Sequence, residues 1–194
     1  HRISSNGAAI NWLKLVDFNF DHKNYIGYEG DTLASALLAH GVHLVGRSFK
    51  YHRPRGIFGS GSEEPNALVR LIGDKSSEPN LRATQIEIYD GLIAESQNRF
   101  PSLKIDFLSI NNVFRRFFPA GFYYKTFMWP TSFWMFYEKL IRKAAGLGKL
   151  SKKSQESERY EHKYAHCDLL VVGSGAAGLQ TAIVAAKSGA RVVI

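Results

Sequence analysis

The sequence contains almost no cysteine, since Cys167 is the only thiol among its 194 residues. A lone cysteine cannot form an internal disulfide, and it cannot supply the several thiolates of a metal cage. These absences exclude the disulfide-stabilised class of small secreted domains. They indicate a reducing environment, and we expect a cytoplasmic protein.

Long hydrophobic runs are also missing. Charged Arg115, Arg116 and Lys125 interrupt the most aromatic part of the chain, and the uncharged stretch that follows them, residues 126–137, has 12 residues. A helix needs about 20 apolar residues to cross a bilayer. We therefore expect no membrane span here.

An initiating methionine is absent as well, because the chain begins with His1, and residues 191–194 have the composition of a strand. We expect the sequence to be part of a longer protein, so its targeting stays undecided. Its 45% hydrophobic content is enough for a core in one or two domains. The net charge of +8 suits nucleic acid, an anionic cofactor or an acidic partner, and does not choose among them.

The first elements along the chain are two strands and a helix. Apolar-alternating runs over 13–20 and 25–28 flank a turn and predict a β-hairpin. Asp31 can cap a following helix over 32–39, which Gly41 is placed to end in the left-handed conformation.

A long loop and two more strands are expected next. Residues 46–66 are rich in Gly, Pro, Ser and Arg, whereas 67–72 and 84–89 have the composition of strands. Strand, strand, helix, long loop, strand, strand is the order of a β-grasp fold. We expect an α+β domain of this kind over residues 8–95.

Residues 96–163 are expected to connect two domains. Twelve of the 25 aromatic residues lie in 114–137. Aromatic patches of this size usually pack between domains or against a partner subunit. Stacking of single-stranded nucleic acid on these rings is a remote alternative. Residues 144–163, rich in Gly, Ser, Lys and Glu, suit a linker or an exposed helix.

Residues 164–194 carry the most specific motif. An apolar run over 167–172, suited to a strand buried on both faces, leads directly into GSGAAG and an alanine-rich helix, and a second strand begins at 191. This order predicts the first βαβ unit of a Rossmann-type FAD/NAD(P)-binding domain. The predicted cofactor-binding residues are Gly173, Ser174, Gly175, Ala176, Ala177 and Gly178.

Each glycine of the motif has a steric role. Gly173 makes the tight turn, Gly175 lets the backbone approach a pyrophosphate, and Gly178 allows the helix to pack closely against the strand. The free N–H groups at the helix start then face the diphosphate. The acidic residue that would bind the ribose is expected past Ile194, so FAD and NAD are not separated, and these residues alone should bind either one poorly.

No residue of the chain is predicted to be catalytic. His40 and His43 flank the end of the predicted helix and are expected to be surface or capping residues rather than metal ligands. The basic loop, residues 47–55, suits contact with a flavin phosphate or an acidic partner, or else simple packing at an interface. Its basic side chains are Arg47, Lys50, His52, Arg53 and Arg55.

Several segments carry a resemblance to a known family. They are residues 27–42 (GYEGDTLASALLAHGV), 47–56 (RSFKYHRPRG), 78–84 (EPNLRAT) and 89–99, which contains YDGL and SQNR. In order and spacing they resemble the alpha subunit of bacterial heterotetrameric sarcosine oxidase. The resemblance covers nearly the whole chain and implies an N-terminal fragment of that subunit.

A departure from related families concerns an iron–sulfur cluster. Related amine dehydrogenase and hydrogen cyanide synthase subunits are similar in their β-grasp domain, which holds a [2Fe-2S] cluster through cysteines after a Pro-Arg-Gly-x-Phe segment. Laying the plant-type C-x4-C-x2-C spacing on this loop puts Gly59, Glu64 and Ala67 at the ligand positions. Because all three thiolates are missing, we expect a ferredoxin-like domain without a cluster, which favours the sarcosine oxidase branch.

The resemblance implies a complex of four different subunits, in which beta, gamma and delta subunits are the partners. It implies oxidative demethylation of sarcosine to glycine, with oxygen as electron acceptor and tetrahydrofolate as one-carbon acceptor. It also implies NAD at the glycine motif, FMN at the alpha/beta interface and FAD in the beta subunit. A related amine or opine dehydrogenase or hydrogen cyanide synthase subunit is the alternative, and a basic, aromatic nucleic-acid-binding module is the remote one.

Overall fold

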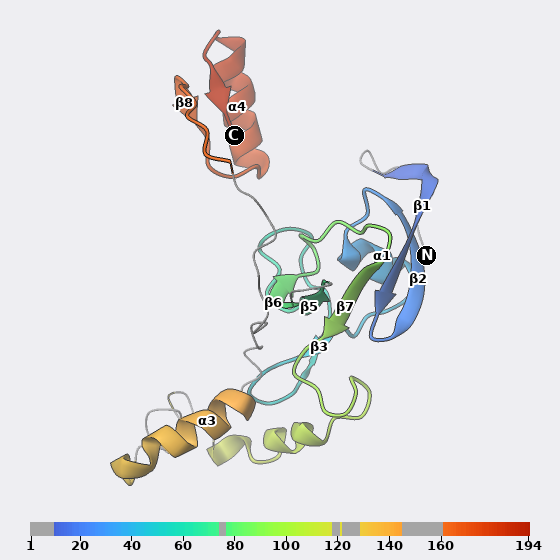
Figure 1. Ribbon diagram of the computed structural model, residues 1–194, viewed down its shortest axis with the longest axis vertical. Helices are drawn as coiled ribbons and strands as arrows, with labels where there is room; N and C mark the ends of the chain where they lie inside the picture. Colours follow the sequence, from blue (N-terminus) through green and yellow to red (C-terminus); the bar gives the residue numbers. More distant parts are fainter. Residues whose placement is uncertain (1–9, 74–76, 118–120, 122–128, 145–160) are drawn as a thin grey trace. The chain divides into compact units, whose positions relative to one another are not determined.

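The computed structural model describes residues 10–73, 77–117, 121, 129–144 and 161–194 (Figure 1). The chain divides into two compact units, His1–Gln155 and Glu156–Ile194, and each is described here by itself.

The first unit contains a five-stranded mixed sheet. Its strands in chain order are β1 (Asn11–Phe20), β2 (Lys23–Glu29), β5 (Leu68–Ile72), β6 (Ser77–Arg82) and β7 (Leu92–Ser96). They lie in the order β2-β1-β7-β5-β6, with β1 and β7 parallel and the other neighbours antiparallel (Figure 1). A mixed sheet of this kind is what the β-grasp prediction requires.

The predicted hairpin is confirmed, with a shorter turn than the sequence suggested. Phe20 pairs with Lys23, so only Asp21 and His22 lie in the turn. Both have positive φ, +48° and +63°. Two positive φ values in a two-residue turn match the right-handed twist of the flanking strands. Aspartate and histidine are among the few residue types that adopt this conformation with moderate strain.

Helix α1 (Leu33–Ala39) forms where it was predicted, but its N-cap is Thr32 and not Asp31. The Thr32 hydroxyl accepts the backbone N–H of Ser35, and the Ser35 hydroxyl accepts the N–H of Thr32, which completes a capping box. The buried Asp31 carboxylate instead accepts the N–H of Tyr28 and the hydroxyl of Ser35. Gly41, with φ +71°, ends the helix as expected.

The prediction of a strand over residues 84–89 is wrong. The alternating side chains Ile86 and Ile88 are buried, as the pattern suggested, but their backbone hydrogen bonds go to the first residue of α1 and to Asp31, just before the helix, rather than to a strand. The carbonyl of Ile86 accepts the N–H of Leu33, and Ile88 donates to the carbonyl of Asp31. Helix termini leave amides without intrahelical partners, and this segment supplies acceptors for them.

The remaining short strands of this unit, β3 (Gly46–Arg47) and β4 (Pro54–Arg55), pair antiparallel inside the predicted long loop. Strands β6 and β7 were not predicted from the sequence; in chain order they follow β5, where the strand over 84–89 was expected.

The core lies between one face of the sheet and α1. Alternate residues of β1 and β7 point into it, together with most of the helix, which carries no charged residue. The fully buried aliphatic side chains include Leu33, Leu37, Val45, Val69 and Leu92.

Short helices follow the sheet in the same unit: η1 (Phe107–Asn112), η2 (Arg115–Phe117), η3 (Thr131–Phe133) and α3 (Trp134–Ala144). Phe107, Trp129 and Phe136 are exposed. Residues 118–120, 122–128 and 145–160, which hold much of the predicted aromatic segment and linker, lie outside the described residues. Within the described ranges, every helix is too short or too polar to span a membrane.

The second unit contains a single βαβ arrangement. Strands β8 (Leu169–Leu170) and β9 (Val192–Val193) pair in parallel, and α4 (Ala176–Lys187) connects them. This is the element order predicted from the glycine motif.

A pair of leucine substitutions tests the description of the core. Leu33 is fully buried, whereas Leu13 is 97% exposed. We expect Leu33→Ala to lower the free energy of unfolding by about 2–5 kcal/mol, because it removes buried methyl groups and leaves a cavity. Leu13→Ala should change it by less than about 0.5 kcal/mol. Urea denaturation followed by tryptophan fluorescence measures both, and equal effects would contradict the assigned core.

Candidate functional site

The glycine motif forms a tight turn between β8 and α4. Gly173 has φ +107°, a conformation that side-chain-bearing residues rarely adopt. Gly175 is the N-cap of α4 and provides no side-chain cap. The first amides of a helix have no intrahelical acceptor, so those of α4 are directed out of the turn. They form the kind of helix N-terminus that binds phosphate.

The space around each glycine differs. A Cβ at Gly178 would lie 2.0 Å from the carbonyl oxygen of Gly173 and 3.3 Å from a methyl of Val171. Any side chain there would push α4 away from the strand. A Cβ at Gly173 or Gly175 would meet nothing within 4 Å. The structure thus places Gly173, Ser174 and Gly175 in the turn and Ala176, Ala177 and Gly178 in the first turn of α4, with open space beside Gly173 and Gly175. Dinucleotide binding by these six residues stays a prediction.

Asp168 and Arg191 fasten the two strands of this unit. The Asp168 carboxylate accepts the backbone N–H of Arg191 at 2.8 Å and lies 3.3 Å from its guanidinium. The Arg191 side chain, followed by its backbone N–H, lowers the pKa of Asp168 below its usual value. Both side chains are exposed, so the ion pair itself contributes little stability.

The basic loop divides into buried and exposed members. Arg47 and His52 point into the first unit, where Arg47 donates to the carbonyls of His52 and Leu103. Arg53 and Arg55 are exposed and donate to Asn112 and Asn66, at 2.9 Å each. The exposed arginines remain available for the predicted flavin phosphate or partner surface, as does the partly exposed Lys50, whose Nζ lies 4.9 Å from the ring centroid of Tyr51. That role stays a prediction.

His40 takes the capping position that was predicted for it. It is the C-cap of α1, and its ring Nε2 lies 2.7 Å from the carbonyl oxygen of Ile26. The ring also packs edge-on against Tyr25. These contacts give it a structural role.

A buried histidine–aspartate pair was not predicted. His52 is 2% exposed, and its Nδ1 lies 2.8 Å from Oδ2 of the buried Asp106. The other carboxylate oxygen of Asp106 accepts the backbone N–H groups of Phe100 and Leu108. The two residues are 54 positions apart, and no local sequence signal relates them.

A histidine held by a carboxylate can serve as a general base when its second ring nitrogen reaches a substrate. Here the Nε2 of His52 is buried and has no hydrogen-bond partner among the described residues. The pair therefore has no ring nitrogen open to a substrate. We interpret it as a structural contact that joins the basic loop to the segment around residue 106.

The three positions that the ferredoxin spacing assigns to ligands lie in one loop. Gly59 and Ala67 supply backbone N–H groups to the carboxylate of Glu64, which is fully buried. In the described part of the chain, no group of three or more His, Cys, Asp or Glu side chains is arranged to hold a metal ion.

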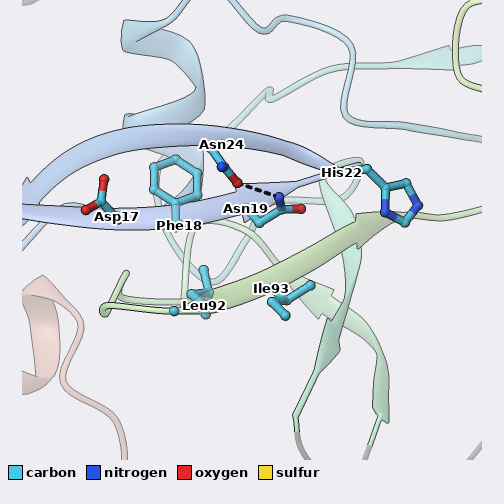
Figure 2. A pocket seen from close by; sticks show the side chains of 8 residues that line it. Asp17, Phe18, Asn19, His22, Asn24, Leu92 and Ile93 are labelled. Atoms are coloured by element: carbon cyan, nitrogen blue, oxygen red, sulfur yellow. Dashed lines mark hydrogen bonds between the residues drawn. The ribbon is translucent and has the colours of Figure 1, made fainter.

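An open depression lies beside β1 and β7 (Figure 2). The side chains of Asn19 and Asn24 in it are hydrogen-bonded to each other at 2.8 Å. Its lining residues are Asp17, Phe18, Asn19, His22, Asn24, Gly91, Leu92 and Ile93. It gathers no set of groups with an evident chemistry, and we assign it no function.

A family model supports the architecture of the first unit. The model described as "2Fe-2S iron-sulfur cluster binding domain" matches residues 14–99. The ferredoxin-like fold predicted for this part of the chain is thereby confirmed. The expected absence of a cluster is a separate matter, which this match does not test.

Curated relatives match nearly the whole chain. Sarcosine oxidase subunit alpha of Rhizobium meliloti (strain 1021) is 56% identical over 180 residues, which are 92% of this chain and 18% of the relative. The subunits of the same name from Corynebacterium sp. strains U-96 and P-1 are 32% and 33% identical over 97% and 98% of this chain, and 15% of each relative. The resemblance recognised in the sequence is confirmed, and the chain spans less than a fifth of the length of these relatives.

Among solved structures, L-proline dehydrogenase from P. horikoshii is 31% identical, covering 43% of this chain and 16% of that chain. Its TM-score is 0.36, too low for an argument about structure.

The His52–Asp106 pair gives a testable prediction. Asp106→Ala removes the acceptor of one ring nitrogen and two backbone amides, so we expect it to lower the free energy of unfolding by about 2–4 kcal/mol. Asp17→Ala, which truncates an exposed aspartate on β1, is the control and should change it by less than about 0.5 kcal/mol. Chemical denaturation measures the free energy of unfolding of both variants. Equally small changes would contradict a structural role for the His52–Asp106 pair.

Proposed function

We propose that this chain is the N-terminal part of the alpha subunit of a heterotetrameric sarcosine oxidase. The observation that carries the proposal is the 56% identity to such a subunit over 92% of the chain. The reaction is the oxidative demethylation of sarcosine to glycine, with oxygen as electron acceptor and tetrahydrofolate as one-carbon acceptor. The partners are the beta, gamma and delta subunits, and the enzyme acts in the cytoplasm.

Within that complex, the part of the alpha subunit seen here contributes a binding element and no catalytic residue. By the resemblance, the beta subunit would hold the FAD that accepts the electrons of sarcosine, and FMN would be bound at the alpha/beta interface. The exposed Arg53 and Arg55 of the basic loop suit that interface, because one guanidinium group can donate two parallel hydrogen bonds to a phosphate or a carboxylate.

The residues of the glycine motif fit a dinucleotide, which we take to be NAD. When bound, NAD supplies a nicotinamide ring that exchanges hydride. Gly173 and Gly175 leave room for the diphosphate, and the amides at the start of α4 would donate to its oxygens. The exposed apolar side chains of α4, such as Leu179, Ile183 and Val184, are available for packing by further parts of a nucleotide-binding domain.

A related amine or opine dehydrogenase subunit is the second candidate, because the matching family model is described by its iron–sulfur cluster. The single cysteine of the chain, Cys167, counts against it, since plant-type ferredoxins use three closely spaced cysteines and a fourth further on.

The substrate is tested on the purified complex, made by expressing the full-length subunit with its neighbouring gene products. We expect sarcosine, added without oxygen, to bleach the flavin absorption, because oxidation of its N-methyl group to an imine passes two electrons to the flavin, as hydride from the methyl C–H bond. Readmitted oxygen should restore the spectrum. A flavin that stays oxidised with sarcosine but is bleached by another secondary amine would overturn the substrate and keep the family.

The glycine motif is tested in the same complex with two alanine substitutions. Gly175→Ala fits its backbone, so we expect an intact fold with dinucleotide affinity reduced about tenfold or more, because the methyl group occupies the space for the diphosphate. Gly178→Ala should impair both affinity and folding, since its methyl would meet a backbone carbonyl. Calorimetric NAD titration and limited proteolysis separate the two effects. Unchanged NAD affinity in Gly175→Ala would place the cofactor elsewhere.

A further inference from the structure

The loop that follows β4 folds around one carboxylate. Glu64 is fully buried, and its two oxygens accept four backbone N–H groups. Oε2 accepts those of Phe58, at 2.7 Å, and Gly59, whereas Oε1 accepts those of Asn66, at 2.7 Å, and Ala67, at 3.1 Å. Amides from both sides of the loop therefore converge on one negative charge.

A concavity lined by backbone N–H groups is a site for an anion, and such nests hold phosphates and iron–sulfur clusters in other proteins. A buried carboxylate is costly unless hydrogen bonds replace its hydration. Four charge-assisted bonds provide that replacement here. Burial alone would raise the pKa of Glu64, but the bonds from Gly59, Asn66, Phe58 and Ala67 outweigh it and lower the pKa below its usual value.

The surroundings of the carboxylate contain little else that is charged. The neighbouring Glu63 is exposed and binds the separate amides of Ser60 and Gly61. The guanidinium of Arg82 reaches the backbone carbonyl of Glu64, at 3.1 Å, and the Thr84 hydroxyl binds the carbonyl of Gly61. Arg82 and Thr84 thus bind carbonyl groups of the loop, whereas the Glu64 carboxylate binds its N–H groups.

The position of this carboxylate conflicts with a cluster. The ferredoxin ligand spacing assigns Gly59, Glu64 and Ala67 to the three thiolates of the loop, so an acidic side chain stands where the second thiolate would be. The amides of the other two positions donate to it. The residues present do not fit a [2Fe-2S] cluster, although the matching family model is named for one.

We propose that the Glu64 carboxylate is the permanent anion of this loop, filling the amide-lined space that a cluster would occupy, so that the domain folds without iron. The domain keeps the ferredoxin-like architecture and carries no electrons. This inference is independent of the substrate proposed above, because it concerns only the loop.

Hydrogen exchange in the intact complex tests the role of the charge. In Glu64→Gln the side chain keeps its shape and loses its charge, so we expect the amides of Phe58, Gly59, Asn66 and Ala67 to exchange about tenfold faster or more. Glu63→Gln makes the same change one residue away on an exposed side chain, and it should leave these four amides protected. Equal protection in both variants would overturn the proposal.

Chemical rescue tests the anion site itself. Glu64→Ala empties the amide-lined space, so added formate or acetate should restore protection to the four amides, whereas chloride at equal ionic strength should not. Glu64→Gln, whose side chain still fills the space, should not respond to formate and is the control for the rescue. If Glu64→Ala does not fold, the exchange rates of Glu64→Gln and Glu63→Gln described above decide the question. Iron and acid-labile sulfide, measured on the wild-type complex after growth in iron-rich medium, should be well below one per alpha subunit. Stoichiometric iron and sulfide that depend on this loop, or formate having no effect in a folded Glu64→Ala, would overturn the proposal.

Discussion

The parallel pairing of β1 with β7 is the constraint on which the first unit depends. Phe18, Asn19 and Phe20 lie opposite Leu92, Ile93 and Ala94, so a strand near the start of the chain is joined to one more than seventy residues later. A parallel pair cannot be closed by a tight turn, and the chain must cross over between its members. The helix, the basic loop and the Glu64 loop all lie in that crossover.

Carboxylates hold that crossover in place. Asp31, Glu64 and Asp106 are buried, and each accepts backbone N–H groups: Asp31 from Tyr28 near the end of β2, Glu64 from its own loop, and Asp106 from Phe100 and from the first turn of η1. Asp21, in the turn between β1 and β2, acts in the same way: it binds the backbone N–H and the hydroxyl of Ser96, at the end of β7, and the guanidinium of Arg99. Buried backbone amides must find acceptors, and in these irregular segments side chains provide them. The loops are consequently ordered by polar groups as much as by the apolar core.

The sequence allowed the hairpin, α1, β5 and the βαβ unit to be predicted, because each depends on local periodicity or on a glycine whose conformation is fixed nearby. The expected strand over 84–89 failed for a physical reason, since alternation reports which side chains are buried and not which backbone groups pair. The N-cap prediction also failed. Thr32 is the N-cap of α1, whereas the carboxylate of Asp31 accepts the backbone N–H of Tyr28. The His52–Asp106 pair joins positions that only the fold brings together, whereas the glycine motif was complete within six consecutive residues.

Glu64 also has a consequence for how the polypeptide matures. An anion carried on the chain is present at the moment the loop is synthesised, cannot dissociate, and needs no delivery by other proteins. A metal-dependent loop, by contrast, completes its folding only after its cofactor arrives. The loop proposed here would thus fold without a supply of iron and sulfide.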